Sequence, residues 1–120
     1  MFNYRIPDRG PVEYVTVGKV GELGPGDRLL VDIGGDPVVI LNIAGEYFAV
    51  ADLCSHDSGP LGEGEVDDYS IECPRHGARF DVRTGEVLSL PAASDIPAYP
   101  VRIVGDELQV GIPIEASSGS

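Results

Sequence analysis

Cys54-Ser55-His56 and Cys73-Pro74-Arg75-His76 stand at the two ends of the stretch that organises this chain, with residues 57–72 between them. We name these segments the first hook and the second hook. They contain the only 2 Cys and the only 2 His of the 120 residues. Thiols and imidazoles bind zinc, copper or iron–sulfur clusters rather than magnesium or calcium. The pattern therefore indicates a metal centre.

The mixture of ligands within each hook narrows the kind of centre. A zinc site with two Cys and two His more often takes its Cys pair from one segment and its His pair from another. A [2Fe-2S] cluster in which one iron binds both Cys and the other binds both His suits two mixed hooks. We therefore expect one [2Fe-2S] cluster. A zinc-binding module, or a disulfide or buried thiol pair with two unrelated His, remains an alternative.

Together with the residues that follow them, the hooks resemble the Rieske iron–sulfur family. The matching features are Cys54-x-His56, Cys73-Pro74-x-His76-Gly77, Phe80-Asp81 and Thr84-Gly85. The resemblance implies that one Rieske-type cluster is held by Cys54, His56, Cys73 and His76. It also implies that the iron bound by His lies at an exposed tip, where electrons pass.

Several residues near the hooks are expected close to the cluster: Gly77, Ala78, Phe80, Arg75 and Pro91. Gly77 follows a ligand, and a glycine there lets backbone N–H groups approach the cluster sulfurs. Leu61 and Phe80 are expected to be packing residues. Pro91 belongs to the segment 90–97, which resembles the proline-containing loop that covers the cluster in this family; a plain connection between strands is the alternative.

Differences from the quinol-oxidising cytochrome bc type of the family bear on the reduction potential. That type has a further Cys in each hook and a disulfide between them, whereas Gly59 and Arg75 stand at these places here. It also has Ser and Tyr hydroxyls beside the cluster, whereas this chain has Ala78 and Phe80. Hydrogen bonds to the sulfurs favour the reduced cluster, so we expect the low end of the Rieske range, about −150 mV.

Composition restricts the class of protein. At 120 residues the chain is expected to form one domain, and its net charge of −12 disfavours nucleic-acid binding, which needs a basic surface. We expect no membrane association and a cytoplasmic location, because we find neither an apolar run long enough to span a bilayer nor a secretory leader. Three basic residues lie near the second hook, Arg75, Arg79 and Arg83, and their role in docking is left open.

Short runs of β-branched and apolar residues, separated by Gly and Asp turns, predict an all-β fold. The expected strands are 12–17, 28–33, 38–43, 46–53, 69–72, 79–82 and 86–88. The resemblance implies Rieske-type antiparallel sheets, with a small cluster-binding subdomain at about residues 53–91 inserted in a basal β-sandwich or barrel. The single domain is expected at residues 12–112, after an irregular lead-in at 1–11 and before a flexible tail at 115–120.

The favoured function is that of a Rieske ferredoxin, which carries one electron at a time. Its expected partners are a flavoprotein NAD(P)H reductase and a terminal non-haem iron oxygenase of the aromatic ring-hydroxylating dioxygenase type. No turnover of substrate is expected, because a mononuclear oxygenase iron needs two further His. The small subunit of an assimilatory nitrite reductase-like complex is an alternative.

Overall fold

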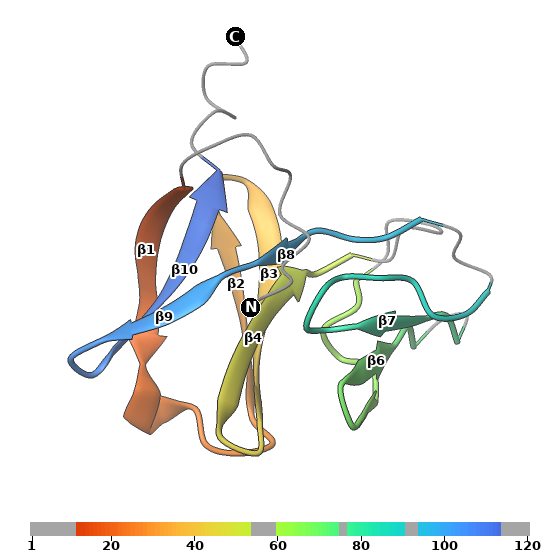
Figure 1. The fold of residues 1–120 in the computed structure, drawn as a ribbon, viewed down its shortest axis with the longest axis horizontal. Coiled ribbons are helices and arrows are strands. Elements are labelled where there is room, and N and C mark those ends of the chain that lie inside the picture. Colours follow the sequence, from red (N-terminus) through yellow and green to blue (C-terminus); the bar gives the residue numbers. More distant parts are fainter. Residues whose placement is uncertain (1–11, 54–59, 75–76, 91–93, 114–120) are drawn as a thin grey trace, which may run out of the picture.

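The computed structural model describes residues 12–53, 60–74, 77–90 and 94–113, and these ranges form β-strands almost throughout (Figure 1). The strands are β1 (Val12–Lys19), β2 (Arg28–Ile33), β3 (Asp36–Ile43), β4 (Glu46–Ala51), β5 (Val66–Asp67), β6 (Ser70–Glu72), β7 (Arg79–Asp81), β8 (Ala98–Tyr99), β9 (Val101–Val104) and β10 (Glu107–Pro113). One short 3-10 helix, η1 (Val20–Glu22), follows β1. The all-β prediction is confirmed. No helical segment within these ranges has the length and apolarity needed for a membrane crossing.

The strands form three antiparallel sheets. Their orders are β1-β10-β9, β2-β3-β4-β8 and β5-β6-β7. Figure 1 shows the first two sheets together at one side of the molecule and the third, which we name the small sheet, beside them. Strands β5 and β6 lie between the two hooks in the sequence and β7 follows the second hook, so the second hook begins directly after β6 and ends shortly before β7.

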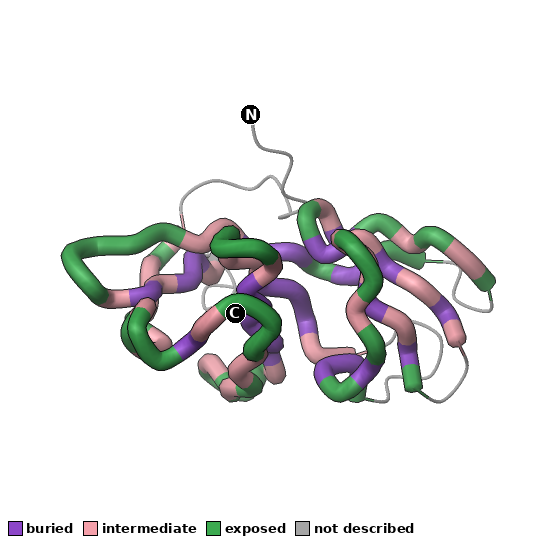
Figure 2. The backbone as a smooth tube through the Cα atoms, turned by 90° about the horizontal axis from the view of Figure 1, so that it is seen from below, coloured by how far each residue is buried: buried purple, intermediate pink, exposed green. Residues whose placement is uncertain are grey.

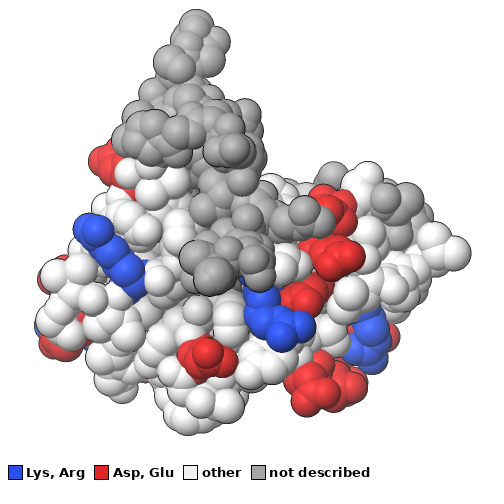
Figure 3. All heavy atoms as spheres, in the orientation of Figure 1, with Lys and Arg blue, Asp and Glu red and all other residues white. Residues whose placement is uncertain are grey.

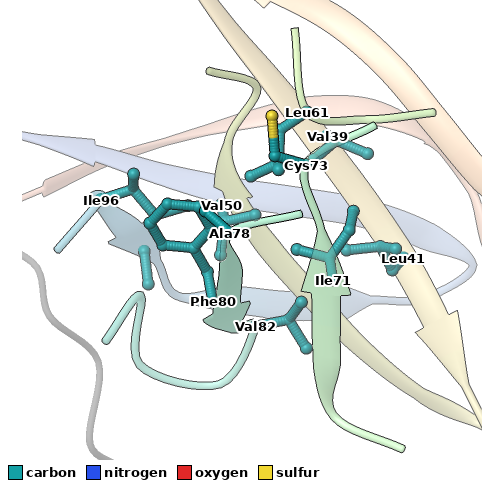
Figure 4. Close-up of a cluster of buried hydrophobic side chains, with 11 residues drawn as sticks. Val39, Leu41, Val50, Leu61, Ile71, Cys73, Ala78, Phe80, Val82 and Ile96 are labelled. Carbon is teal, nitrogen blue, oxygen red and sulfur yellow. The ribbon is translucent and has the colours of Figure 1, made fainter. Parts of the chain in front are cut away.

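Strand β3 lies at the centre of the molecule because both of its faces are covered. Val38 and Ile40 pack with Leu108 of β10, in a set of apolar side chains that we name the basal core. Val39 and Leu41 point the other way and pack with residues of the small sheet, in a second set that we name the small-sheet core (Figure 4). Successive side chains of a strand point to opposite faces. The continuous apolar run of β3 is therefore explained by a middle layer buried on both sides.

Burial follows this arrangement. Figure 2 shows the buried segments in the middle of the molecule and exposed loops at its two ends. The basal core is made by buried residues of the two larger sheets and the segment after η1: Leu23, Val38, Ile40, Ala49, Ala51, Tyr99, Leu108 and Val110. The small-sheet core is made by Val39, Leu41, Val50, Leu61, Ile71, Cys73, Ala78, Phe80, Val82, Ile96 and Ala98. The four-stranded sheet β2-β3-β4-β8, which we name the middle sheet, contributes to both cores and so joins the small sheet firmly to the rest of the molecule.

Most predicted strands differ from the structure by one or two residues at an end, and the strand predicted at 86–88 is absent. The strand expected at 46–53 ends at Ala51, because the chain bends at Asp52, whose carboxylate accepts hydrogen bonds from the backbone of Leu61 and Gly62. The strand expected at 86–88 is not formed; Val87 makes only an isolated bridge with Phe80. Both deviations lie where the chain leaves a regular strand for a bend or turn. Local β-propensity does not report such turns.

Tyr99, a residue of the basal core, gives the protein a predicted loss of stability in alkali. Its side chain is 7% exposed, and burial, followed by the negative charge of Asp36, raises its pKa. The folded state therefore holds the phenol proton more tightly than the unfolded chain does. Stability from this group is fully present below the unfolded pKa of about 10 and is lost as the pH rises through the higher folded pKa.

We expect Tyr99→Phe to lose less stability than the parent protein when the pH is raised from about 9 to about 11. Urea unfolding at a series of pH values measures this slope. Tyr14→Phe is the matched control, because it removes a tyrosine from the other large sheet and leaves Tyr99 in place. Equal slopes for Tyr99→Phe and the parent protein would contradict the prediction.

Candidate metal centre

Cys73 is the one predicted ligand within the described residues. Cys54, His56 and His76 lie outside them, as do Arg75, Pro91 and Gly59. Cys73 directly follows β6, is 1% exposed and belongs to the small-sheet core. Figure 4 shows its sulfur at one end of this core, beside Leu61. No group of three or more Cys, His, Asp or Glu that could hold a metal occurs among the residues that the structure describes. The ligand set therefore stays a prediction.

The second hook is closed at its base by two backbone hydrogen bonds. The N–H of Cys73 donates to the carbonyl of Ala78 at 2.7 Å, and the N–H of Gly77 donates to the carbonyl of Cys73 at 2.9 Å. Gly77 has a φ of 81°, a left-handed conformation that glycine adopts without steric cost. The structure thus gives Gly77 a definite backbone role, which is to close the loop that begins at Cys73.

The first hook is closed at its base by a carboxylate. Oδ1 of Asp52 accepts hydrogen bonds from the backbone N–H groups of Leu61 at 2.9 Å and Gly62 at 2.5 Å. These bonds join the residues before Cys54 to the residues after Gly59. Asp52 could not be identified from the sequence, because one carboxylate among 20 carries no distinguishing signal until residues 61 and 62 fold back onto it.

A second set of contacts places the two hook bases beside each other. The backbone N–H of Glu72 donates to the carbonyl of Glu65 at 2.9 Å, so the segment after the first hook pairs with the strand before the second. Nη1 of Arg28, on β2, donates to the carbonyls of Gly62 at 2.6 Å and Gly64 at 2.7 Å. Arg28 could not be identified from the sequence either, since its partners are more than thirty residues away. These contacts fasten the connection between the hooks to the middle sheet.

The closest approach in this region is at Gly64. A Cβ atom added there would lie 1.6 Å from the carbonyl oxygen of Glu72. The backbones of the two segments therefore approach each other at a distance that only glycine permits. Glycines in such segments are most often turn residues. Gly64 is instead required by a contact with a strand that is distant in the sequence.

The surroundings of Cys73 fit an iron–sulfur cluster. Leu61, Ala78 and Phe80 are fully buried and line the core to which the thiol belongs, and the packing role predicted for Leu61 and Phe80 is confirmed. Thiolates are the usual ligands of such clusters, and a surrounding apolar shell controls solvent access and so helps to set their potential. A thiol at the base of a closed loop, at one end of an apolar core, is suited to this use.

Both described arginines near the second hook are engaged in ion pairs. Arg79 pairs with Glu72 at 2.9 Å, and Arg83 pairs with Asp81 at 2.9 Å. The guanidinium of Arg83 also lies 4.4 Å from the ring centre of Tyr69. Figure 3 shows acidic and basic side chains next to one another over this part of the molecule. Both arginines therefore have carboxylate partners within the chain.

Replacing Asp52 by alanine should weaken the first hook. The change removes a charged acceptor from two backbone N–H groups, and each such bond contributes about 1.5–3 kcal/mol. We expect a loss of roughly 2–4 kcal/mol in the free energy of unfolding and a lower iron content per chain. Asp32→Ala is the matched control, because Asp32 accepts one similar bond from Gly35 in the β2–β3 turn. It should leave the iron content unchanged; equal iron loss in both variants would contradict the role of Asp52.

Comparison with known protein families gives one match that covers most of the chain. The model of the Rieske [2Fe-2S] domain matches residues 13–100. The biphenyl 2,3-dioxygenase ferredoxin component of Rhodococcus jostii is 39% identical over 92 residues, which are 77% of this chain and 86% of that protein. The 3-phenylpropionate/cinnamic acid dioxygenase ferredoxin subunit of Shigella boydii is 38% identical over 96 residues, 78% of this chain and 89% of that protein.

Solved structures agree with these relatives. The ferredoxin of carbazole 1,9a-dioxygenase from Nocardioides aromaticivorans superposes with a TM-score of 0.79 at 35% identity, over 83% of this chain and 98% of that one. A ferredoxin in complex with the oxygenase of carbazole 1,9a-dioxygenase matches with a TM-score of 0.77 at 29% identity, over 82% of this chain and 92% of that one. A nitrite reductase small subunit from Mycobacterium tuberculosis shares the fold, with a TM-score of 0.76 at 22% identity, over 85% of this chain and 96% of that one.

Proposed function

The chain belongs to the Rieske [2Fe-2S] domain family, and on that premise we propose that it carries one electron at a time between the other components of a ring-hydroxylating dioxygenase system. The donor is a flavoprotein NAD(P)H reductase and the acceptor is a terminal non-haem iron oxygenase. The observation that carries this proposal is the match at 38–39% identity to ferredoxin components over nearly their whole length. The likeness at 22% identity to the nitrite reductase subunit concerns the fold alone.

The complex of a related ferredoxin with its oxygenase supports the choice of acceptor. Ferredoxin components pass electrons and do not transform the substrate, and we assign the same role to this chain. Its 2 His are both committed to the proposed cluster, which leaves none for a second iron centre. A reductase that draws on NAD(P)H also favours a cytoplasmic location.

We assign the cluster to Cys54, His56, Cys73 and His76, within a Rieske domain at residues 12–112 and a cluster-binding subdomain at about 53–91. When bound, the cluster supplies reversible one-electron chemistry at a potential set by its ligands and surroundings. Residues of the chain shape and shield the site that holds the cluster. Asp52 and the bonds between Cys73, Gly77 and Ala78 close the hooks, while Leu61 and Phe80 form an apolar wall beside Cys73.

Potentiometric titration of the purified protein, followed by its visible spectrum, tests this function. We expect a brown protein that bleaches in a one-electron step near the low end of the Rieske range, about −150 mV. A midpoint well above zero would contradict the expected low potential. A colourless protein without a redox step, after anaerobic preparation, would favour the zinc-binding alternative. Electron transfer from a dioxygenase reductase to its oxygenase, measured with and without the chain, then tests the named partners.

A further inference from the structure

Glu72 and Arg79 form an ion pair across β6 and β7, at the base of the second hook. The two residues are directly opposite each other in the sheet register, and Nη2 of Arg79 lies 2.9 Å from Oε1 of Glu72. The side chain of Glu72 is 33% exposed and that of Arg79 is 35% exposed. Partial burial reduces the screening of such charges by solvent and salt. The pair therefore presents two opposite charges in a defined geometry next to Cys73.

The pair is oriented with its negative end toward the second hook. Glu72 immediately precedes Cys73, and its Oε2 lies 3.5 Å from the position that a Cβ atom would take on Gly77. Gly77 directly follows His76 in the sequence. The carboxylate thus lies against the closed base of the hook. The guanidinium extends in the other direction, where Nη1 of Arg79 donates to Oγ of Ser70 at 3.2 Å.

We propose that this oriented pair tunes the reduction potential of the cluster, and this inference rests on the proposed function. Reduction adds one negative charge to the cluster. The nearer carboxylate opposes that charge, whereas the more distant guanidinium favours it, so the pair as a whole lowers the potential. Arg79 limits the effect because it neutralises Glu72. The contacts of Glu72 with Gly77 and of Arg79 with Ser70 fix this orientation.

Three variants test the proposal through the midpoint potential of the loaded protein. Glu72→Gln removes the nearer negative charge, so the potential should rise. Arg79→Gln leaves the carboxylate without its cation, so the potential should fall. In the double variant the potential should lie between those of the two single variants. Iron and sulfide per chain and the visible spectrum are measured first, so that all potentials refer to fully assembled clusters.

Arg83→Gln is the matched control. It removes the same charge from the same sheet region, but Arg83 pairs with Asp81 and covers Tyr69 rather than the hook. We expect its potential to change much less than that of Arg79→Gln. Shifts of the same sign for Glu72→Gln and Arg79→Gln, no shift, or an equal shift for Arg83→Gln would overturn the proposal.

Failure of a protein to assemble the cluster is interpreted separately for Arg79→Gln and for the parent protein. If Arg79→Gln does not assemble a cluster, Arg79→Lys retains the cation and should keep the parent potential, while Glu72→Gln should still raise it; any other pair of values overturns the tuning role. A parent protein with no cluster and no redox step would instead refute the proposed function itself. The two failures are therefore distinguishable.

Discussion

Replacement of Gly64 by alanine should prevent formation of the cluster and unfold much of the small-sheet region. The added Cβ atom would lie 1.6 Å from the carbonyl oxygen of Glu72 and 2.8 Å from its carbonyl carbon. These are backbone atoms of β6, so no side chain can rotate away to make room. Separation of the segments would break the hydrogen bond between Glu72 and Glu65 and disturb the one from Arg28 to Gly64. We expect a loss of more than about 4 kcal/mol in the free energy of unfolding.

A series of three glycine variants separates steric effects from the general effect of adding a methyl group. Gly21 has no atom within 4 Å of an added Cβ, so Gly21→Ala should change stability by less than about 0.5 kcal/mol. At Gly62 the nearest atoms belong to the side chains of Asp52 and Leu30, at 3.0 and 3.1 Å, and these can shift. Gly62→Ala should cost about 1–3 kcal/mol. Urea unfolding and iron content measure the series, and a Gly64→Ala protein as stable as Gly62→Ala would contradict the steric argument.

Much of the fold could be predicted from the sequence because its signals are local. Strand β2 has the predicted bounds, since its apolar run ends at Gly34 and Gly35, which adopt φ values of 63° and 95°. Strand β3 was predicted from its apolar run, but its role as a middle layer depends on the small sheet, which is packed against it from elsewhere in the chain. Strands β5 and β8 have 2 residues each and are too short to give a periodic pattern.

The candidate site likewise has one part that could be predicted from the sequence and one part that could not. The hooks could be found in the sequence because Cys and His are rare and their spacing is specific. The groups that close the hooks could not, since Asp52 accepts bonds from residues 9 and 10 positions away and Arg28 donates to residues 34 and 36 positions away. Gly64 was visible as a glycine, but the reason for it is a contact with β6. The metal ligands can therefore be predicted from two short motifs. The residues that hold the hooks in place depend on contacts between distant parts of the sequence and cannot be predicted in this way.

Replacement of Cys73 by alanine should eliminate the cluster. We assign Cys73 as one of two thiolate ligands of a single iron, and no other cysteine besides Cys54 is present to replace it. Iron should fall from about two ions per chain to near zero, with loss of the brown colour and the redox step. Because metal binding contributes to folding when the site is not formed in the unfolded chain, the variant should also be less stable than the loaded parent protein.

Loss of stability alone could also reduce cluster content, so the Cys73 result needs a variant that damages the same core without removing a donor. Val82→Ala serves this purpose, because Val82 is 1% exposed in the small-sheet core and carries no metal-binding atom. It should cost about 1–3 kcal/mol and keep nearly all of its iron. If Val82→Ala loses as much iron as Cys73→Ala, packing rather than ligation explains both results. If Cys73→Ala retains a full cluster, the ligand assignment is wrong, and with it the reason for placing this thiol at the base of the second hook.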